Sequence, residues 1–185
     1  MNDHPRDVPP TGRLEQGFVQ VYTGDGKGKT TAAIGLAVRA MGAGLRVYIG
    51  QFIKAGDSNE IEALRRFGGL ITMRQFGRGC WLHGEPDPAD VAAARIGLRE
   101  IRLAVTSGDY DLVILDEANP ATWFKLIDVQ DFLDLIDLKP PHVELVFTGR
   151  RADPRLLERA DLVTEMVERK HYFSSGISAR QGIER

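Results

Sequence analysis

The sequence predicts a three-layer α/β fold with a mostly parallel sheet, and three observations lead to this prediction. Short apolar runs rich in Val and Ile recur along the chain, which is typical of buried strands in a parallel sheet. Longer amphipathic stretches separate these runs, and strands that alternate with helices imply a sheet with helices on its faces. The first apolar run leads directly into a glycine-rich loop and then into a helix, as in a phosphate-binding loop.

The apolar runs predict six strands, and the stretches between them predict helices. The strands are expected at Phe18–Tyr22, Val47–Phe52, the weaker Leu70–Met73, Leu112–Leu115, Val143–Phe147 and Leu162–Val167. The helices are expected at Thr30–Met41, Asn59–Phe67, Asp87–Thr106, Val129–Leu135 and Pro154–Ala160. In the longest helix, Asp87 suits the cap and Pro88 the first helical position. The Gly-rich stretch Gly77–Pro86 has no period and is expected to be a loop.

Length and composition are typical of a soluble globular protein. The chain has 185 residues, close to one domain in length, and 43% of them are hydrophobic and 27% charged. Residues 1–16 are polar and contain three prolines. We therefore expect a flexible N-terminal segment at 1–16 and a single domain at 17–185.

Charge and cysteine content exclude several classes of protein. The chain has 24 Lys and Arg against 26 Asp and Glu, whereas a dedicated nucleic-acid binder carries a broad positive field. A single Cys excludes an internal disulfide and a multi-thiolate metal site. No apolar run approaches the roughly 20 residues of a membrane span, and the N-terminus lacks the apolar core of a secretory signal. We expect a cytoplasmic protein with no membrane or nucleic-acid partner.

The strongest motif lies at Val19–Thr31, where an apolar strand, a Gly-rich loop and a helix follow one another. Glycines let backbone N–H groups converge on phosphate oxygens, and the helix N-terminus adds partial positive charge. Lys29 is then expected to reach phosphate oxygens, and Thr30 to place its hydroxyl on Mg²⁺. The motif predicts nucleotide binding.

The loop departs from the G-x-x-x-x-G-K-[ST] pattern at one position, because Thr23 stands where the first Gly is required. Gly24 and Gly26 follow instead, and Lys27 adds a cation. The alternative of a Gly-rich turn with incidental lysines is disfavoured, since strand, loop and helix agree. A dinucleotide site also fits less well: the spacing is G-x-G-x-G, and the second strand ends at Gln51 without an acidic residue for a ribose.

A second half of the site is predicted where the buried strand after Asp111 ends in Asp116 and Glu117. Two carboxylates beside a phosphate loop are typical of the Walker B arrangement, in which Mg²⁺ finds hard oxygen ligands. The alternative is a solvated strand end. The residues alone leave open whether Glu117 binds metal or polarises water. Because the guanine-specificity motif Asn-Lys-x-Asp is absent, they predict only a small domain that binds a magnesium nucleotide.

Beyond these motifs, the chain resembles the P-loop ATP:corrinoid adenosyltransferases from about Glu15 to Glu184. The stretches that carry the resemblance are Thr23–Ala33, Gln51–Lys54, Leu115–Asn119, Thr148–Arg150 and Lys170–Glu184. The family also has Thr in place of the first glycine of the loop. The resemblance implies a RecA-like P-loop NTPase fold and transfer of the 5′-deoxyadenosyl group of ATP to cobalt(I) of a corrinoid. The expected corrinoid is cob(I)yrinic acid a,c-diamide or cob(I)alamin, in adenosylcobalamin synthesis or salvage.

In this family the leaving group is triphosphate, members are homodimers, and we expect a flavoprotein to supply the reduced corrinoid. The nucleotide-binding positions implied by the resemblance are Gly24, Asp25, Gly26, Lys27, Gly28, Lys29, Thr30, Thr31, Arg39 and Arg150. Lys29 and Glu117 are the catalytic candidates, and the Mg²⁺ candidates are Thr30, Asp116 and Glu117. Cobalt(I) is itself the nucleophile, so the protein is expected to supply position and charge rather than a base.

One loop departs from the family pattern. The family has Gly-x-Gly-Phe-x-Trp where this chain reads Gly77-Arg-Gly-Cys-Trp-Leu82. We expect Trp81 to contact the corrinoid, the alternative being that it packs on a helix. Cys80 has no flanking His pair and is not expected to be a nucleophile, and His171 is expected to be structural rather than a corrinoid contact.

Two other functions remain open on the sequence. A P-loop ATPase or kinase of another pathway would use the same loop and Glu117 for γ-phosphate chemistry, and would release ADP. A non-catalytic nucleotide or corrinoid carrier would use the loop only to bind, and the altered Gly77–Leu82 loop keeps this alternative open.

Overall fold

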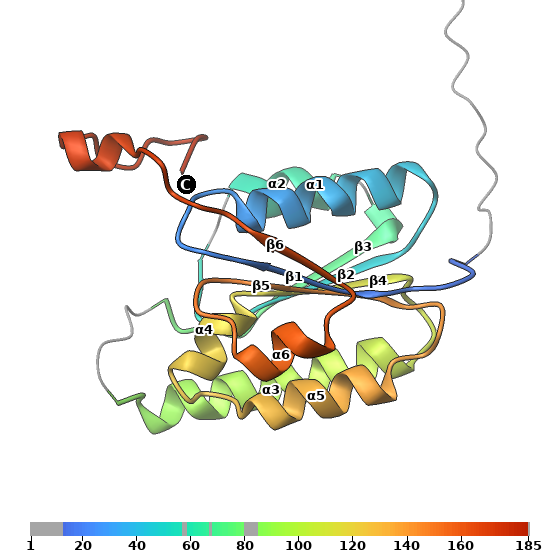
Figure 1. The fold of residues 1–185 in the computed structure, drawn as a ribbon. Coiled ribbons are helices and arrows are strands. Elements are labelled where there is room, and N and C mark those ends of the chain that lie inside the picture. Colours follow the sequence, from blue (N-terminus) through green and yellow to red (C-terminus); the bar gives the residue numbers. More distant parts are fainter. Residues whose placement is uncertain (1–12, 57–58, 67, 80–84, 185) are drawn as a thin grey trace, which may run out of the picture.

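The computed structural model describes residues 13–56, 59–66, 68–79 and 85–184 of the chain. In these residues a sheet lies between two layers of helices, which confirms the predicted three-layer α/β fold (Figure 1). The predicted flexible segment falls mostly on residues 1–12, which lie outside the described residues. Arg13, close to the end of that segment, donates a hydrogen bond to the carbonyl of Gly108 at 2.8 Å.

Six parallel strands form the sheet, in the spatial order β3-β2-β4-β5-β1-β6. Their bounds are β1 Val19–Thr23, β2 Val47–Gln51, β3 Ile71–Gln75, β4 Leu112–Asp116, β5 Glu144–Thr148 and β6 Leu162–Glu165. The two strands β2 and β4 are buried along their whole length. Because β2 and β4 have helices over both faces, their sequences are almost continuously apolar rather than alternating.

Helices cover both faces of the sheet (Figure 1). One layer holds α1 (Lys29–Gly42) and α2 (Asn59–Arg65), and the other holds α3 (Pro88–Thr106), α4 (Ala118–Trp123), α5 (Val129–Leu138) and α6 (Pro154–Arg159). Asp87 caps α3 by accepting a hydrogen bond from the Ala89 amide, as its sequence predicts. Two short 3₁₀ turns, Gly68–Leu70 and Tyr172–Ser175, complete the elements of the described part.

The two faces of the sheet are packed differently. Against α1 the core is built from small residues of the helix, Ala33, Ala37 and Ala40, which lie under buried side chains of β2, β4 and β5. Small side chains let α1 approach the sheet closely and keep the phosphate loop before it near the strand ends. On the opposite face, large side chains such as Phe132 and Phe147 fill the core.

The structure corrects the ends of two predicted strands and adds one helix. The strand predicted to Phe52 ends at Gln51, because the chain turns off the sheet just after it: the Lys54 amide donates to the Phe52 carbonyl, and Ile53 has φ 66°. The strand predicted to Val167 ends at Glu165. Helix α4 was not predicted, since it has only six residues and contains Pro120. Pro120 is tolerated because it lies in the first turn, where its missing N–H has no helical partner.

The last strand and the segment after it are the most exposed part of the fold. All four residues of β6 are exposed, and β6 pairs only with β1. After β6 the chain crosses above the loop between β1 and α1 and projects from the body of the domain (Figure 1). Across the described residues, no helix combines the length and the apolar composition needed to cross a membrane.

We expect Gly97→Ala to destabilise the fold by about 1–3 kcal/mol through overpacking of α3. A Cβ at Gly97 would lie 2.4 Å from Phe76 Cγ and 2.7 Å from its Cβ, which cannot move aside as a flexible side-chain end could. Urea unfolding of the purified variant measures the change.

Gly35→Ala is the matched control, because Gly35 is an exposed residue of α1 and a methyl group added there would have no atom within 4 Å. It should stabilise the protein by about 0.5–1 kcal/mol, as Ala does in an open helix site. If the two variants were equally stable, the close packing of α3 against Phe76 would be contradicted.

Candidate active site

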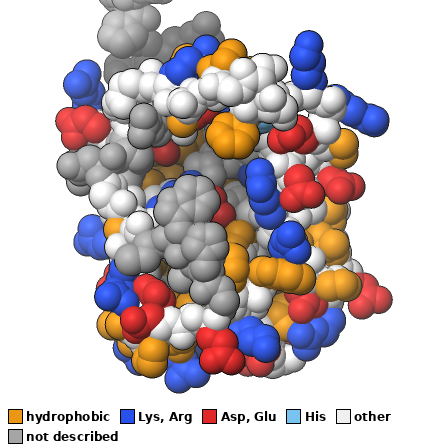
Figure 2. Space-filling model, turned by 90° about the vertical axis from the view of Figure 1, so that its left-hand side faces the viewer, with side chains coloured by type: hydrophobic (Ala, Val, Ile, Leu, Met, Phe, Trp, Pro, Cys, Tyr) orange, Lys and Arg blue, Asp and Glu red, His pale blue; other side chains and the backbone are white. Residues whose placement is uncertain are grey.

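The predicted site residues gather at the carboxyl edge of the parallel sheet. The phosphate loop follows β1, Asp116 ends β4 and is followed by Glu117, and Thr148 ends β5. Carboxyl ends of parallel strands share one edge, and open α/β sheets bind ligands there. Figure 2 looks onto this edge and shows a hollow in which basic and acidic side chains lie close together.

The phosphate loop has the backbone that its glycines predict. Gly24 and Gly28 have φ values of 90° and 121°, which only glycine adopts without strain. Gly28 caps α1 without a side-chain hydrogen bond. The first amides of this 14-residue helix are therefore open to an anion.

Gly24 and Gly26 are required for a second reason, which was not predicted from the sequence. The segment after β6 crosses the loop, and the Gly26 amide donates to the carbonyl of Met166 at 2.7 Å. A Cβ at Gly24 or Gly26 would lie 2.4 or 2.7 Å from that same carbonyl oxygen. These two positions must be glycine for the C-terminal segment to pass, whether or not a phosphate is bound.

Lys29 is held over the loop by main-chain carbonyls. Its Nζ donates to the carbonyl oxygens of Gly24 and Gly26 at 2.7 and 2.6 Å. Burial lowers the pKa of Lys29, and the positive charge of Arg150 lowers it further, while carboxylates such as Glu117 oppose the change. Within the described part of the chain, no carboxylate forms an ion pair with Lys29. Its charge is therefore available to an anionic ligand.

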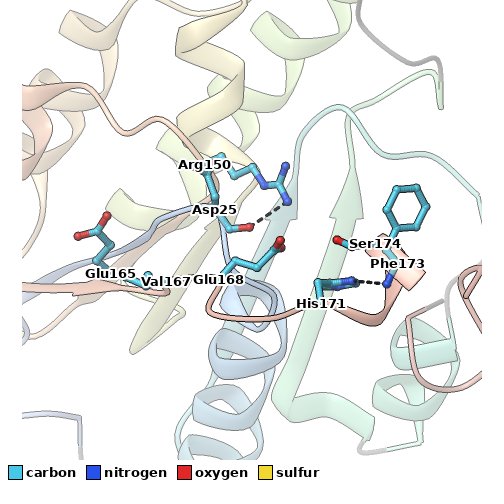
Figure 3. Close-up of a pocket in the computed structure, with 8 residues that line it drawn as sticks. All are labelled: Asp25, Arg150, Glu165, Val167, Glu168, His171, Phe173 and Ser174. Carbon is cyan, nitrogen blue, oxygen red and sulfur yellow. Dashed lines mark hydrogen bonds between the residues drawn. The ribbon is translucent and has the colours of Figure 1, made fainter. Parts of the chain in front are cut away.

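Arg150 lies on the other side of the loop, in the turn after β5. Its guanidinium donates to the carbonyl of Asp25 at 2.9 Å (Figure 3). Helix α4 supports this turn: Asn119 Nδ2 donates to the carbonyl of Gly149 at 2.8 Å, and Arg151 lies over the Trp123 ring at 4.6 Å. The structure thus brings Arg150 to the phosphate loop, as the resemblance implies.

Asp116 is buried and its carboxylate is surrounded by donors. Oδ1 accepts from the hydroxyls of Thr30 and Thr148 at 2.8 and 2.6 Å. Oδ2 accepts from Gln51 Nε2 at 2.6 Å, and Gln51 Oε1 in turn accepts from Gln75 Nε2 at 2.8 Å. A chain of hydrogen bonds therefore links β3, β2, β4 and β5 to the first turn of α1.

Glu117 points into the hollow instead. It has a left-handed backbone with φ 56°, and its amide donates to the Thr148 hydroxyl at 3.1 Å. Its carboxylate lies 3.2 Å from Lys54 Nζ, which is also 3.6 Å from Asp116 Oδ2. Burial alone lowers the pKa of Lys54, but the negative charges of Asp116 and Glu117 outweigh burial and raise that pKa.

A cavity of about 880 Å³ lies between these residues and the C-terminal segment. Its lining includes Lys27, Gly28, Lys29, Thr30 and Thr31 of the loop and α1, then Lys54, Glu117 and Arg150, and His171, Ile183 and Glu184 of the C-terminal segment. The C-terminal segment is closed on itself, because Glu184 accepts hydrogen bonds from the Tyr172 hydroxyl and from Arg180.

A second cavity, of about 640 Å³, adjoins the first and shares Arg150, Glu168 and His171 with it (Figure 3). His171 Nδ1 accepts from the Phe173 amide at 3.0 Å and so caps the last 3₁₀ turn. His171 also lines both cavities, so the expectation that its role is structural stays a prediction.

Of the predicted residues that the structure describes, Arg39 is not brought to this site. Arg39 lies ten residues after Lys29 in α1, which is about 15 Å along the helix axis, and it does not line the cavity among the described residues. Trp81 falls outside the described residues, as do Cys80 and Leu82. Sequence reasoning had no role for Thr148 or Lys54. Their shared signal is a polar side chain at or just after the end of a buried strand.

The residues present fit a magnesium nucleotide. Mg²⁺ in such enzymes is held by one or two carboxylates and a hydroxyl together with substrate phosphates and water. Thr30, Asp116 and Glu117 provide this donor set beside the open end of α1. No cluster of three or more acidic, His or Cys side chains that could hold a metal occurs in the described ranges.

Comparison with known proteins agrees with this geometry. The family model described as ATP:corrinoid adenosyltransferase BtuR/CobO/CobP matches residues 15–185. A corrinoid adenosyltransferase of Pseudomonas aeruginosa is 36% identical over 173 residues, covering 93% of this chain and 85% of that protein. One from a Sinorhizobium species is 37% identical (92% and 81% covered), and CobA of Salmonella typhimurium is 32% identical (92% and 86%). The chain belongs to the ATP:corrinoid adenosyltransferase family.

Proposed function

We propose that this protein transfers the 5′-deoxyadenosyl group of ATP to cobalt(I) of a corrinoid and releases triphosphate. Family membership supports this reaction. The structural observation that carries it is the phosphate loop, where Lys29 has no carboxylate partner among the described residues and the α1 amides are open. Such a site binds a strongly anionic group, and triphosphate is the most anionic product that ATP gives.

In this reaction a cobalt–carbon bond forms as the bond between C5′ and its oxygen breaks, and triphosphate leaves with the bonding electrons. Negative charge grows on the leaving oxygen, so cations that hold the triphosphate stabilise the transition state. We assign that task to Lys29, Lys27 and Arg150, which line the cavity. Cobalt(I) supplies the nucleophile, and no side chain is required as a base.

Magnesium is part of the proposal. When bound, it would neutralise phosphate charge, held by the Thr30 hydroxyl and the Glu117 carboxylate. We assign the direct contact to Glu117, because both oxygens of Asp116 already accept hydrogen bonds. Asp116 then positions the Thr30 hydroxyl.

Finer assignments follow the family resemblance. We propose cob(I)yrinic acid a,c-diamide or cob(I)alamin as the corrinoid, a flavoprotein as its reductant, a homodimer as the assembly, and the cytoplasm as the compartment. Arg39 would contact nucleotide only from the other subunit of such a dimer, because it lies far from the loop of its own chain.

Product analysis with ATP and chemically reduced corrinoid tests the reaction. Triphosphate together with an adenosylated corrinoid is expected. Release of ADP would indicate an ATPase or kinase instead, and binding without turnover would indicate a carrier.

Lys29→Ala should lower turnover by at least about 100-fold, the scale of losing one donor to a developing anion. Circular dichroism should be unchanged, because Lys29 Nζ bonds only to loop carbonyls in the described structure. Arg99→Ala removes a positive charge from an exposed position of α3, outside the site, and serves as control. Near-normal turnover of Lys29→Ala would contradict the site.

Thr148→Val should lower turnover by about tenfold or more and stability by about 1–3 kcal/mol. Valine fills the same space but neither donates to Asp116 nor accepts from the Glu117 amide. Thr148→Ser keeps the hydroxyl and should remain close to wild type in steady-state kinetics and thermal melts. Equal effects of Val and Ser would show that packing, not hydrogen bonding, is what Thr148 provides.

A further inference from the structure

Lys54 is presented to the site by a strained turn. Its amide donates to the carbonyl of Phe52 at 2.6 Å, and Ile53 between them has φ 66°. This is a γ-turn with a positive central φ, a conformation that is rare and strained. For a β-branched residue such as Ile53 a positive φ is an outlier.

The turn is held in place from outside. The Ile53 side chain packs against the large core cluster. The Gly79 amide donates to the Ile53 carbonyl at 3.4 Å, and a Cβ at Gly77 would lie 2.0 Å from Ile53 C and 2.4 Å from the Lys54 carbonyl oxygen. Strain of this kind persists only where the surrounding structure enforces it, and it gathers at functional sites.

The turn directs the Lys54 ammonium to the two carboxylates that the proposed function assigns to magnesium. It lies 3.2 Å from Glu117 Oε1 and 3.6 Å from Asp116 Oδ2, and it also lines the cavity shared with Lys29. Lys29 and Arg150 bond to loop carbonyls instead. In the described structure Lys54 is thus the cation that pairs with these carboxylates.

We propose that Lys54 is a counter-cation of the metal site, which pairs with Glu117 until ligands bind; this rests on the proposed function. When a divalent cation and triphosphate bind together, the Lys54 ammonium moves from Glu117 to a triphosphate oxygen. Two carboxylate charges cannot balance both an ammonium and a divalent cation, so ammonium and metal repel each other at this site. A triphosphate in the cavity supplies the negative charge that Lys54 needs after the exchange.

The proposal makes metal and triphosphate binding depend on each other. Without triphosphate, a divalent cation must displace Lys54 with no new partner for the ammonium, and it binds weakly. With triphosphate, both cations are neutralised. Lys54 therefore disfavours metal alone and favours the metal complex of the anion.

The test uses the full chain, Mg²⁺ and inorganic triphosphate, with affinities from isothermal titration calorimetry. Lys54→Met should bind Mg²⁺ alone about tenfold more tightly than wild type, and triphosphate in saturating Mg²⁺ about tenfold more weakly. Its melting temperature in EDTA should fall below that of wild type and should recover in Mg²⁺. Lys54→Gln is measured alongside, so that one poorly folded variant does not decide the outcome.

Two controls isolate the charge of Lys54. Lys54→Arg keeps the cation and should retain wild-type values, and Arg99→Met removes a charge from an exposed position and should also leave them unchanged. Unchanged or weaker Mg²⁺ affinity in Lys54→Met, unchanged triphosphate affinity, or an equal effect of Lys54→Arg would overturn the proposal. Failure of the proposed reaction would appear separately, as ADP in the product analysis, since these binding measurements contain no corrinoid.

Discussion

The carboxylate of Asp116 is the constraint on which the rest of the site depends. It is almost fully buried, and a buried carboxylate is tolerated only when hydrogen bonds replace the water it has lost. Thr30, Thr148 and Gln51 provide them, from α1, β5 and β2. Satisfying one charge therefore fixes the position of the phosphate helix relative to three strands.

The second constraint comes from the end of the chain. The segment after β6 crosses the phosphate loop closely enough for Met166 to accept from the Gly26 amide. It then contributes His171, Ile183 and Glu184 to the cavity. The loop is thus covered by a segment about 140 residues away in sequence. The hydrogen bonds of Glu184 to Tyr172 and Arg180 stay within that segment. The segment is tied to the domain by the crossing at Met166 and by Gln181, whose Nε2 donates to Asn59 Oδ1 at 3.1 Å.

The strands and the phosphate loop could be predicted because each is encoded by a short, continuous stretch of sequence. Apolar runs located six strands within two residues, and the run from β1 to α1 indicated the phosphate loop. Helix α4 was not predicted because it has only six residues, includes Pro120 and shows no helical periodicity of apolar residues. No role was predicted for Gln51, Lys54 or Thr148, because these residues come together only when the ends of the parallel strands lie side by side. Arg39 was assigned by resemblance alone, and α1 carries it away from the loop of its own chain.

Lys29 and Lys54 lie in opposite electrostatic surroundings within the same cavity. Lys29 is partly buried near Arg150 and has no ion-pair partner in the described residues, and its pKa is lowered. Lys54 pairs with two carboxylates, and its pKa is raised. A bound anion would give Lys29 the negative partner that it lacks, whereas a bound cation would compete with Lys54 for its two carboxylates. A neutral ligand would do neither. A ligand that carries both signs, such as a triphosphate with its metal, is stabilised at Lys29 and releases Lys54 in the same event, which makes binding at the two ends mutually dependent.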